Sequence, residues 1–303
     1  MSATPVTPAT PMTVVTGATG QLGSRVVDRL LERLPADRIG VSVRDPEAPA
    51  AVALAGRGVR VRRGDFTRPE TLARAFEGAR QLLLVSSTTT GEAVVAQHRA
   101  AIDAARAAGV ERVVYTSHQG SSATSRFAPM PDHAATEQYL ASSGLAHTSL
   151  RNGFYATTLP ALVDSALRTG TLALPEDGPV SWTGHDDLAE AAVAVLLGQV
   201  RHEGPTPALT GPAALDLDAV AAQLSELAGR TVQRVTVSDD AYLASMAEHG
   251  APKWRARLML GLFQAARDGE FAVVAPDLAE IIGHPATPVG PLLRQTVHAA
   301  GAA

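Results

Sequence analysis

The stretch Thr13–Gly23, which reads TVVTGATGQLG, decides the fold of this 303-residue chain. Four β-branched residues, which favour a strand, run directly into a loop with three glycines, and an amphipathic helix follows. In such a loop Gly17 permits a tight turn, Gly20 lets the backbone approach a pyrophosphate, and Gly23 allows the helix to pack closely on the strand. The stretch therefore predicts a dinucleotide-binding loop at the start of a helix, whose N–H groups and dipole hold the phosphates. The residues expected to contact the dinucleotide are Gly17, Thr19, Gly20, Gln21, Leu22 and Gly23.

Strand-like and helix-like segments alternate outward from this loop. Short apolar runs are separated by helical stretches such as Gln21–Leu34, in which Val26, Val27 and Leu30 fall on one face. Strands joined by helices in this way form a parallel sheet covered on both faces, and ligands bind at the carboxyl ends of its strands. We therefore predict an α/β protein with a Rossmann-type, doubly wound parallel sheet. The predicted strands are Thr13–Thr16, Ile39–Val43, Val59–Val61, Leu82–Val85, Arg112–Thr116 and His147–Leu150.

The regular alternation weakens in the second half of the chain, which predicts a change of domain. Residues 12–155 are expected to form the NAD(P)-binding domain, and residues 156–303 a smaller, mostly helical substrate-binding domain. Residues 185–198 are predicted to form one more helix that packs back on the sheet, opened by the capping-type acidic pair Asp186-Asp187. Residues 1–11 contain Pro and Thr and no charge, so they are interpreted as a disordered leader.

The composition excludes several classes of function. The chain carries 26 Lys and Arg against 30 Asp and Glu, a formal charge of -4, and has no basic stripe, so no nucleic-acid partner is expected. It has no cysteine, which excludes disulfides, thiolate catalysis and cysteine-bound metals and fits a cytoplasmic location; no metal site is predicted. It shows neither a signal peptide nor a run of about 18 apolar residues, so no interaction with a membrane is expected.

The end of the second predicted strand bears on the choice of cofactor. An acidic residue there accepts hydrogen bonds from the adenosine ribose and favours NAD, whereas a guanidinium suits the 2′-phosphate of NADP. Arg44 stands directly at this strand end, so NADPH is predicted, although Asp45 beside it leaves contact with a 2′-hydroxyl open. Residues at the ends of the third, fourth and fifth predicted strands are expected to contact the cofactor; the alternative is that they only form local hydrogen bonds. These strand ends supply Asp65 and Phe66 near the adenine, Ser86 and Ser87 beneath the nicotinamide ribose, and Thr116 and Ser117.

Several motifs along the chain together resemble a known family. They are TGATGQLG at 16–23, VRDP at 43–46, GDF at 64–66, VYTS at 114–117, LRNGFY at 150–155 and DLAEAAVAVL at 187–196. The glycine spacing alone resembles many atypical and extended short-chain dehydrogenases, but the combination is similar to the NmrA-like atypical family, and within it to the NADPH-dependent type 2 quinone oxidoreductases. This resemblance implies a Rossmann fold, NADPH as cofactor and hydride transfer to a quinone. The same family includes dye reductases and redox-sensing regulators without a catalytic role.

The usual catalytic pair of short-chain dehydrogenases, Tyr-x-x-x-Lys, is missing from the sequence. The single lysine, Lys253, lies far downstream, and His133 and Glu137 occupy the matching positions. Hydride addition to a simple ketone generates an alkoxide roughly as basic as hydroxide (water pKa ~15.7), whereas a quinone yields a phenolate-type anion whose acid has a pKa of about 10. The difference of ~6 units, about 8 kcal/mol, is free energy that no strong acid need supply. Such a site suits quinones or other conjugated acceptors rather than simple ketones.

Candidate residues for the acceptor come from the helix after the fifth strand and from two strand ends. His133 is the predicted proton donor or hydrogen-bond donor to the acceptor oxygen. Glu137, four residues later on the same helical face, is predicted to orient or charge it; the alternative is that both residues only pack or face solvent. An aromatic side chain at the strand end could stack on a flat acceptor or belong to the core. The residues expected at the substrate are Asn152, Phe154, Tyr155 and His118.

The leading hypothesis is an NADPH-dependent oxidoreductase that transfers hydride to a quinone or a similar conjugated electrophile. The alternative is a non-catalytic, NADP(H)-sensing regulatory protein of the NmrA type, which would need the glycine loop and Arg44 equally. His133 and the aromatic strand end favour the enzyme, since a sensor requires no acceptor pocket. A sugar-nucleotide epimerase or an ordinary ketoreductase is disfavoured by the missing Tyr-x-x-x-Lys. The expected partner is a small planar acceptor, with a homodimer as the assembly to be tested.

Overall fold

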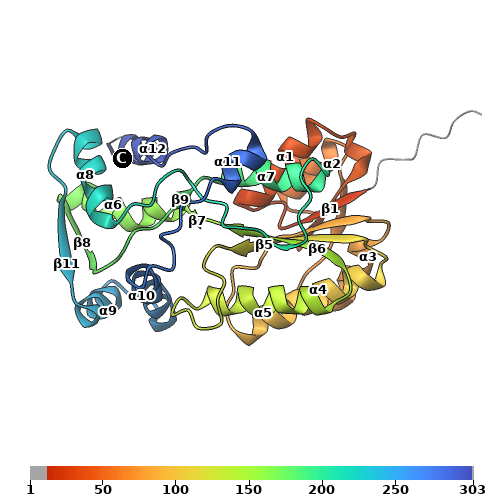
Figure 1. Ribbon diagram of the computed structural model, residues 1–303, viewed down its shortest axis with the longest axis horizontal. Coiled ribbons are helices and arrows are strands. Elements are labelled where there is room, and N and C mark those ends of the chain that lie inside the picture. Colours follow the sequence, from red (N-terminus) through yellow and green to blue (C-terminus); the bar gives the residue numbers. More distant parts are fainter. Residues whose placement is uncertain (1–11, 302–303) are drawn as a thin grey trace, which may run out of the picture.

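β1 (Thr13–Thr16) lies inside a seven-stranded sheet with the order β10-β6-β5-β4-β1-β2-β3, in which every pair is parallel (Figure 1). The computed structural model describes residues 12–301, so the predicted leader, residues 1–11, lies outside the described residues. The strand order reverses beside β1, where the chain crosses from β3 to β4, and α/β sheets bind ligands at such a switch point. The predicted doubly wound fold is therefore confirmed. The other strands are β2 (Ile39–Val43), β3 (Arg60–Arg63), β4 (Gln81–Leu84), β5 (Arg112–His118), β6 (Ala146–Asn152) and β10 (Gly204–Pro205).

Both faces of the sheet are covered, which explains why its inner strands read as continuous apolar runs. Neighbouring residues of a strand point to opposite faces, so Val15 and Leu83 join one hydrophobic core whereas Val14 and Leu82 join another. The first face packs against α1 (Gln21–Leu31), α2 (Pro49–Gly56), α7 (His185–Leu196) and α11 (Asp277–Ile282), and the second against α3 (Leu72–Phe76), α4 (Glu92–Ala107) and α5 (Pro129–Ser142) (Figure 1). The short 3-10 helices η1 (Ala36–Arg38) and η2 (Pro69–Thr71) precede β2 and α3.

The C-terminal part of the chain builds a third hydrophobic core, which includes Phe154, Phe263 and Phe271. β6 leads directly into the first strand of this part, so the residues after the sixth strand connect it to the sheet. Two small parallel sheets pair β7 (Phe154–Tyr155) with β9 (Trp182–Thr183) and β8 (Thr171–Pro175) with β11 (Gln233–Val237). The helices are η3 (Ala156–Thr158), α6 (Leu159–Thr169), α8 (Leu217–Ala228), α9 (Asp239–Glu248), α10 (Lys253–Arg267) and α12 (Gly290–Gly301).

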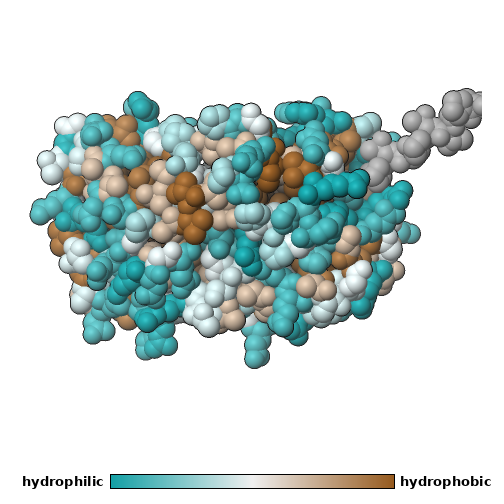
Figure 2. Space-filling model, viewed as in Figure 1, coloured by the Kyte–Doolittle hydropathy of each residue, from teal (hydrophilic) through white to brown (hydrophobic). Residues whose placement is uncertain are grey.

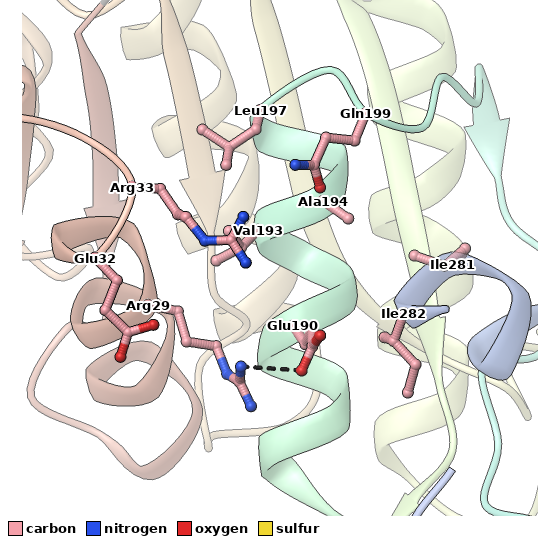
Figure 3. A pocket seen from close by; sticks show the side chains of 10 residues that line it. All are labelled: Arg29, Glu32, Arg33, Glu190, Val193, Ala194, Leu197, Gln199, Ile281 and Ile282. Atoms are coloured by element: carbon pink, nitrogen blue, oxygen red, sulfur yellow. Dashed lines mark ion pairs between the residues drawn. The ribbon is translucent and has the colours of Figure 1, made fainter. Parts of the chain in front are cut away.

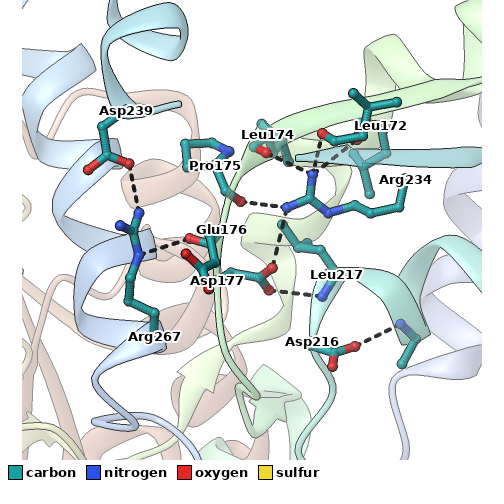
Figure 4. A network of polar contacts seen from close by, with 12 residues as sticks. Leu172, Leu174, Pro175, Glu176, Asp177, Asp216, Leu217, Arg234, Asp239 and Arg267 are labelled. Carbon is teal, nitrogen blue, oxygen red and sulfur yellow. Dashed lines mark hydrogen bonds and ion pairs between the residues drawn. The ribbon is translucent and has the colours of Figure 1, made fainter. Parts of the chain in front are cut away.

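A buried polar network joins the segments of this C-terminal part (Figure 4). The guanidinium of Arg234 on β11 donates hydrogen bonds to the carbonyl oxygens of Leu174 and Pro175 on β8 and pairs with Asp177 at 3.4 Å. Asp177 also accepts the N–H of Leu217 at the start of α8, at 2.9 Å. Because the side chains of Arg234 and Asp177 are only 6% and 8% exposed, these bonds hold the segments together in a place that is largely shielded from solvent.

The acidic pair at the start of α7 does not cap the helix, and this prediction is wrong. The N-cap residue is Gly184, without a side-chain cap, because the helix begins at His185 and both carboxylates fall inside its first turn. Asp186 forms an ion pair with Arg25 of α1 at 2.9 Å. The buried Asp187 accepts hydrogen bonds from the N–H and hydroxyl of Thr287, at 2.6 and 3.0 Å. The pair thus joins α7 to α1 and to the loop after α11.

Several elements that follow residue 155 pack against the sheet, so the packing alone does not fix a domain boundary. α7 shares a core with α1 and with strands of the sheet. α11 and the short strand β10, which also follow residue 155, join the sheet as well. The boundary at residues 155 and 156 stays a prediction.

The face shown in Figure 2 is mostly hydrophilic, with hydrophobic side chains in small groups. Over residues 12–301 the large hydrophobic side chains that are exposed are Val52, Trp254, Val273 and Val274. None of the helices in this range is long and apolar enough to span a bilayer.

Candidate cofactor and acceptor site

The glycine loop between β1 and α1 has the close backbone contacts that its sequence predicts. Gly17 has a φ of +59°, a left-handed conformation that side chains disfavour, and its carbonyl oxygen accepts the N–H of Gly20 at 2.9 Å. A Cβ atom on Gly23 would lie 2.2 Å from that same oxygen, so no side chain fits there. Gly20 is the N-cap of α1 and supplies no side-chain cap, which leaves the N–H groups of the first turn to hold a phosphate.

The predicted contact residues of this loop divide into two groups. Leu22 and Gly23 are buried, and the Leu22 side chain belongs to the core between the sheet and α1, so only its backbone could approach a ligand. The exposed members are Gly17, Thr19, Gly20 and Gln21. The open surface of the loop is thus formed by backbone and small side chains.

Arg44 directly follows the last residue of β2 at the carboxyl edge of the sheet, and its side chain is exposed. Within residues 12–301 its guanidinium has no hydrogen-bond partner or ion pair. The neighbouring Asp45 carboxylate accepts the N–H of Glu47 at 3.1 Å and so closes its own turn. Asp65 likewise holds its own loop, because its carboxylate accepts the N–H of Thr67. Burial raises the pKa of Asp65, but the hydrogen bonds from Thr67 and the charges of Arg68 and Arg44 outweigh burial, so the pKa lies below its usual value. The Arg44 guanidinium, which has no hydrogen-bond partner, suits a 2′-phosphate. The carboxylates of Asp45 and Asp65 already accept hydrogen bonds and are less suited to bind a ribose hydroxyl.

Side chains of β5 and α4 hold the loop after β4. The hydroxyl of Thr116 accepts the N–H of Ser86 at 2.9 Å, and Nε2 of the buried His98 accepts the N–H of Ser87 at 3.1 Å. Burial lowers the pKa of His98 to about 3, so this ring is a neutral structural acceptor. Thr116 is fully buried, whereas Ser86 and Ser87 remain half-buried at the loop. Contact of the two serines with a cofactor stays a prediction, whereas the buried Thr116 holds the backbone of their loop.

His133 lies in the first turn of α5 and is held by a residue that the sequence interpretation had not singled out. Its Nδ1 atom lies 2.8 Å from the hydroxyl of Tyr115, a fully buried side chain of β5. The ring of His118, at the end of β5, stacks beside it with 6.1 Å between centroids. Burial lowers the pKa of His133 to about 4 and that of His118 well below its usual value, so both rings are neutral near pH 7.

Glu137 does not contact His133, contrary to the predicted orienting role. Its carboxylate accepts two bonds from Arg151 on β6, at 3.1 and 2.8 Å, and a third from the hydroxyl of Ser117, at 2.6 Å. Arg151 was missed because the sequence offers no sign that an arginine inside a strand faces α5. The three residues tie β5 and β6 to α5 below the strand ends, so Ser117 is also committed to this bond rather than open to a cofactor.

Asn152 at the end of β6 presents an unsatisfied buried acceptor. Its side chain is 1% exposed, its amide N–H donates to the hydroxyl of Tyr155 at 3.4 Å, and its carbonyl oxygen has no partner. The ring of Tyr155 packs against His185, with 4.3 Å between centroids. Burial lowers the pKa of His185 to about 4, so this imidazole is neutral as well. A buried oxygen without a donor is costly unless a ligand supplies one.

Phe154 belongs to an aromatic cluster in the core rather than to an open stacking surface. It is 6% exposed, and its ring lies 5.3 Å from His118, 5.4 Å from Trp182 and 5.1 Å from Phe271. Phe271 comes from the loop after α10, more than a hundred residues later, and no sequence pattern placed it here. The cluster forms an apolar wall behind His118, so the predicted aromatic stacking is left to Tyr155.

A cavity away from the strand ends is shown in Figure 3. It has a volume of about 150 Å³ and lies between α1, α7 and α11, beside the ion pair of Arg29 with Glu190 at 2.9 Å. Its walls contain none of the predicted site residues. The functional site stays predicted at the strand ends, because the glycine loop, Arg44 and Asn152 all lie at the carboxyl ends of strands in one parallel sheet.

The sheet, its glycine loop and the side chains at its carboxyl edge define a dinucleotide-binding protein of the Rossmann class. Within this class the sequence matches the NmrA-like family over residues 10–271. The chain belongs to the NmrA-like family, and the resemblance noted in the sequence is confirmed.

Individual relatives refine this assignment. Quinone oxidoreductase 2 of Escherichia coli (strain K12) is 35% identical over 268 residues, which cover 88% of this chain and 92% of that protein. The crystal structure of an NADPH-dependent quinone oxidoreductase from Escherichia coli, complexed with NADPH, has a TM-score of 0.87 at 34% identity and covers 94% of this chain and 99% of that one. The triphenylmethane reductase of Citrobacter sp., complexed with NADP(H), has a TM-score of 0.85 at 31% identity, with the same shares covered. NmrA, a negative transcriptional regulator in complex with NADP, is 18% identical with a TM-score of 0.72 and shares the fold alone.

Proposed function

We propose that this chain is an NADPH-dependent oxidoreductase that transfers hydride to a quinone or a similar conjugated electrophile. Its similarity to a quinone oxidoreductase and to a triphenylmethane reductase supports an enzyme over a regulator. The observation that carries the proposal is the ring of His133, which takes the tyrosine position of Tyr-x-x-x-Lys, is held 2.8 Å from the hydroxyl of Tyr115, and is kept neutral by burial. A neutral imidazole is a hydrogen-bond donor and a weak acid, which suits an acceptor whose reduced anion is already stable.

The residues at the strand ends fit NADPH. The glycine loop and the start of α1 would hold the pyrophosphate, and Arg44 would pair with the 2′-phosphate. The orphaned carbonyl oxygen of Asn152 would accept a hydrogen bond from the nicotinamide carboxamide, a donor that the described residues do not provide. Ser86 and Ser87 would lie beneath the ribose.

The chemistry then divides between cofactor and protein. When bound, NADPH supplies a hydride, which delivers two electrons and one proton equivalent to the acceptor. The Nε2–H of His133 stabilises the negative charge that develops on the acceptor oxygen, and water supplies the second proton of the reduced product. Glu137, neutralised by Arg151, holds α5 against the strands and takes no part in proton transfer.

The acceptor itself is proposed to be small and planar. Tyr155 supplies a half-buried ring at the strand end, and the cluster around Phe154 supplies an apolar wall. A cytoplasmic location and assembly as a homodimer are part of this proposal; size-exclusion chromatography with light scattering tests the second.

The first test follows the absorbance of NADPH with and without a panel of small quinones, in parallel with NADH. The Arg44→Ala variant should bind NADPH more weakly and lose its preference over NADH, because only NADPH carries the 2′-phosphate. Arg33→Ala is the matched control, since Arg33 is an exposed arginine just after α1 whose guanidinium has no partner in the described chain. Tight NADPH binding without turnover on any acceptor would reject the reductase and favour the NADP(H)-sensing regulator.

A further inference from the structure

The side chain of Tyr115 has a polar partner on the face of β5 that packs against α4 and α5. The side chain lies between the sheet and the layer of α4 and α5 and is 0% exposed. Its ring meets His98 edge-on at 5.5 Å and lies 5.8 Å from His133. Its hydroxyl reaches past this core to Nδ1 of His133, at 2.8 Å.

The protonation state of each partner and the burial of the phenol proton together indicate the direction of this hydrogen bond. Burial raises the pKa of Tyr115 far above its usual value, against a smaller opposing effect of Thr136, so the phenol keeps its proton. Burial lowers the pKa of His133 to about 4, so this ring is neutral. A neutral imidazole has one N–H and one acceptor nitrogen. The phenol can donate to Nδ1 or accept from it, but only donation gives its buried proton the acceptor that lies 2.8 Å away, and the ring proton then lies on Nε2.

The other ring nitrogen of His133 is left for a ligand. Nε2 makes no hydrogen bond with any residue between 12 and 301, and it is not among the fully buried polar atoms without a partner. His118, stacked alongside, is held in the same way, because its Nδ1 accepts the N–H of Gly120 at 3.1 Å. The protein therefore fixes two neighbouring imidazoles with their N–H groups on the side away from the protein partner.

We infer that Tyr115 is a positioning residue, whose hydroxyl holds His133 in the Nε2–H tautomer and so presents this ring as a donor to the acceptor oxygen. The catalytic consequence rests on the proposed function, whereas the tautomer does not. Without the hydroxyl, the proton of His133 would be free to move to Nδ1, and the ring would then turn an acceptor towards a developing anion. This arrangement provides the orientation that a Tyr-x-x-x-Lys pair provides elsewhere.

The Tyr115→Phe variant tests this inference, because it keeps the ring and its packing and removes only the hydroxyl. We expect kcat for quinone reduction to fall roughly 10- to 100-fold, as when the orienting partner of a functional histidine is removed, with KM and NADPH affinity near the wild-type values. In ¹⁵N-histidine NMR of the full chain, His133 should show the Nε2–H tautomer in the wild type and a mixture of tautomers in the variant. The signal is assigned by its loss in His133→Asn.

Two controls separate positioning from structural damage. In Tyr139→Phe the lost hydroxyl donates to Asp103 on the outer side of α4 and α5, so neither kcat nor the His133 signal should change. Tyr115→Phe should add nothing to kcat in a His133→Asn background if it acts through that ring. An unchanged tautomer in Tyr115→Phe, or additive losses of kcat, would overturn the inference. If the wild type reduces no acceptor, the proposed function fails, and the NMR experiment still decides the role of Tyr115.

Discussion

The environment of His133 determines how activity should respond to acid. The groups that face its ring are Tyr115, which stays protonated, and the neutral His98 and His118, so no carboxylate raises its pKa above about 4. In the proposed mechanism the neutral ring is the active form; the neutral population is complete well above that pKa and is lost only as the pH falls through it. We therefore expect kcat/KM for a small quinone to stay flat between about pH 5 and 8. An acid limb near 6.5, the pKa of an ordinary imidazole, would contradict this assignment.

Gly23 is the loop position at which a side chain is least tolerated. In Gly23→Ala the new Cβ would start 2.2 Å from the Gly17 carbonyl oxygen, so the loop or the start of α1 must shift. We expect loss of measurable NADPH binding in titration calorimetry and a lower melting temperature. Gly56→Ala in α2 is the matched control, because no atom lies within 4 Å of its new Cβ; helix propensity should make it up to about 1 kcal/mol more stable. Equal effects of the two substitutions would mean that the close approach at Gly23 is not needed.

Single residues differ in how far the sequence could place them. The glycine loop and Arg44 were predictable because their chemistry depends on local spacing and on the end of one strand. The partner of Glu137 was not, since Arg151 and Glu137 meet only when α5 packs beside β6. Tyr115 was hidden because its place in an apolar strand identifies it as a core residue, and only the structure shows its hydroxyl crossing to His133.

Among the elements, those that carry their own pattern were predicted most closely. β1 and β2 match their predicted ranges because every residue in them is buried. β3 runs to Arg63, past the predicted end, because it lies at the sheet edge, where arginines replace apolar residues. α7 was predicted as a helix, but its acidic first turn serves distant partners, which a capping pattern cannot reveal.

The buried ion pair of Arg234 on β11 with Asp177 in the loop after β8 should contribute strongly to the stability of the C-terminal part. Arg234→Ala would leave Asp177 charged in a site largely shielded from solvent and free several carbonyl oxygens, so we expect a loss of about 3–5 kcal/mol in urea unfolding. Arg168→Ala removes an arginine from an exposed pair with Asp164 within α6 and should cost at most about 1 kcal/mol. Similar losses in both variants would show that burial does not strengthen the Arg234 network.

At the scale of the whole molecule, the sheet was predictable and the C-terminal packing was not, for a physical reason. The strands and helices of the sheet repeat a local pattern, and the handedness of their connections leaves few arrangements. The third core depends on contacts between distant segments, such as the ring of Phe271 on Phe154 and His118. No local periodicity encodes such contacts.

Burial of neutral histidines also makes the stability of the molecule depend on pH. The pKa is lowered by burial in His98, His118, His133 and His185. In the unfolded chain each histidine would titrate near pH 6.5. Below that pH the unfolded state binds protons that the folded state does not bind, so the free energy of unfolding decreases as the pH falls. We expect urea unfolding to show nearly constant stability from pH 8 to 7 and then a loss of up to roughly 1.4 kcal/mol per pH unit for each histidine. Asp177, whose pKa burial raises, opposes this trend only near its own lower titration range. A His98→Asn variant removes one titrating group and should lose stability less steeply, whereas equal stability of the wild type at pH 7 and 5 would show that these rings accept protons while buried.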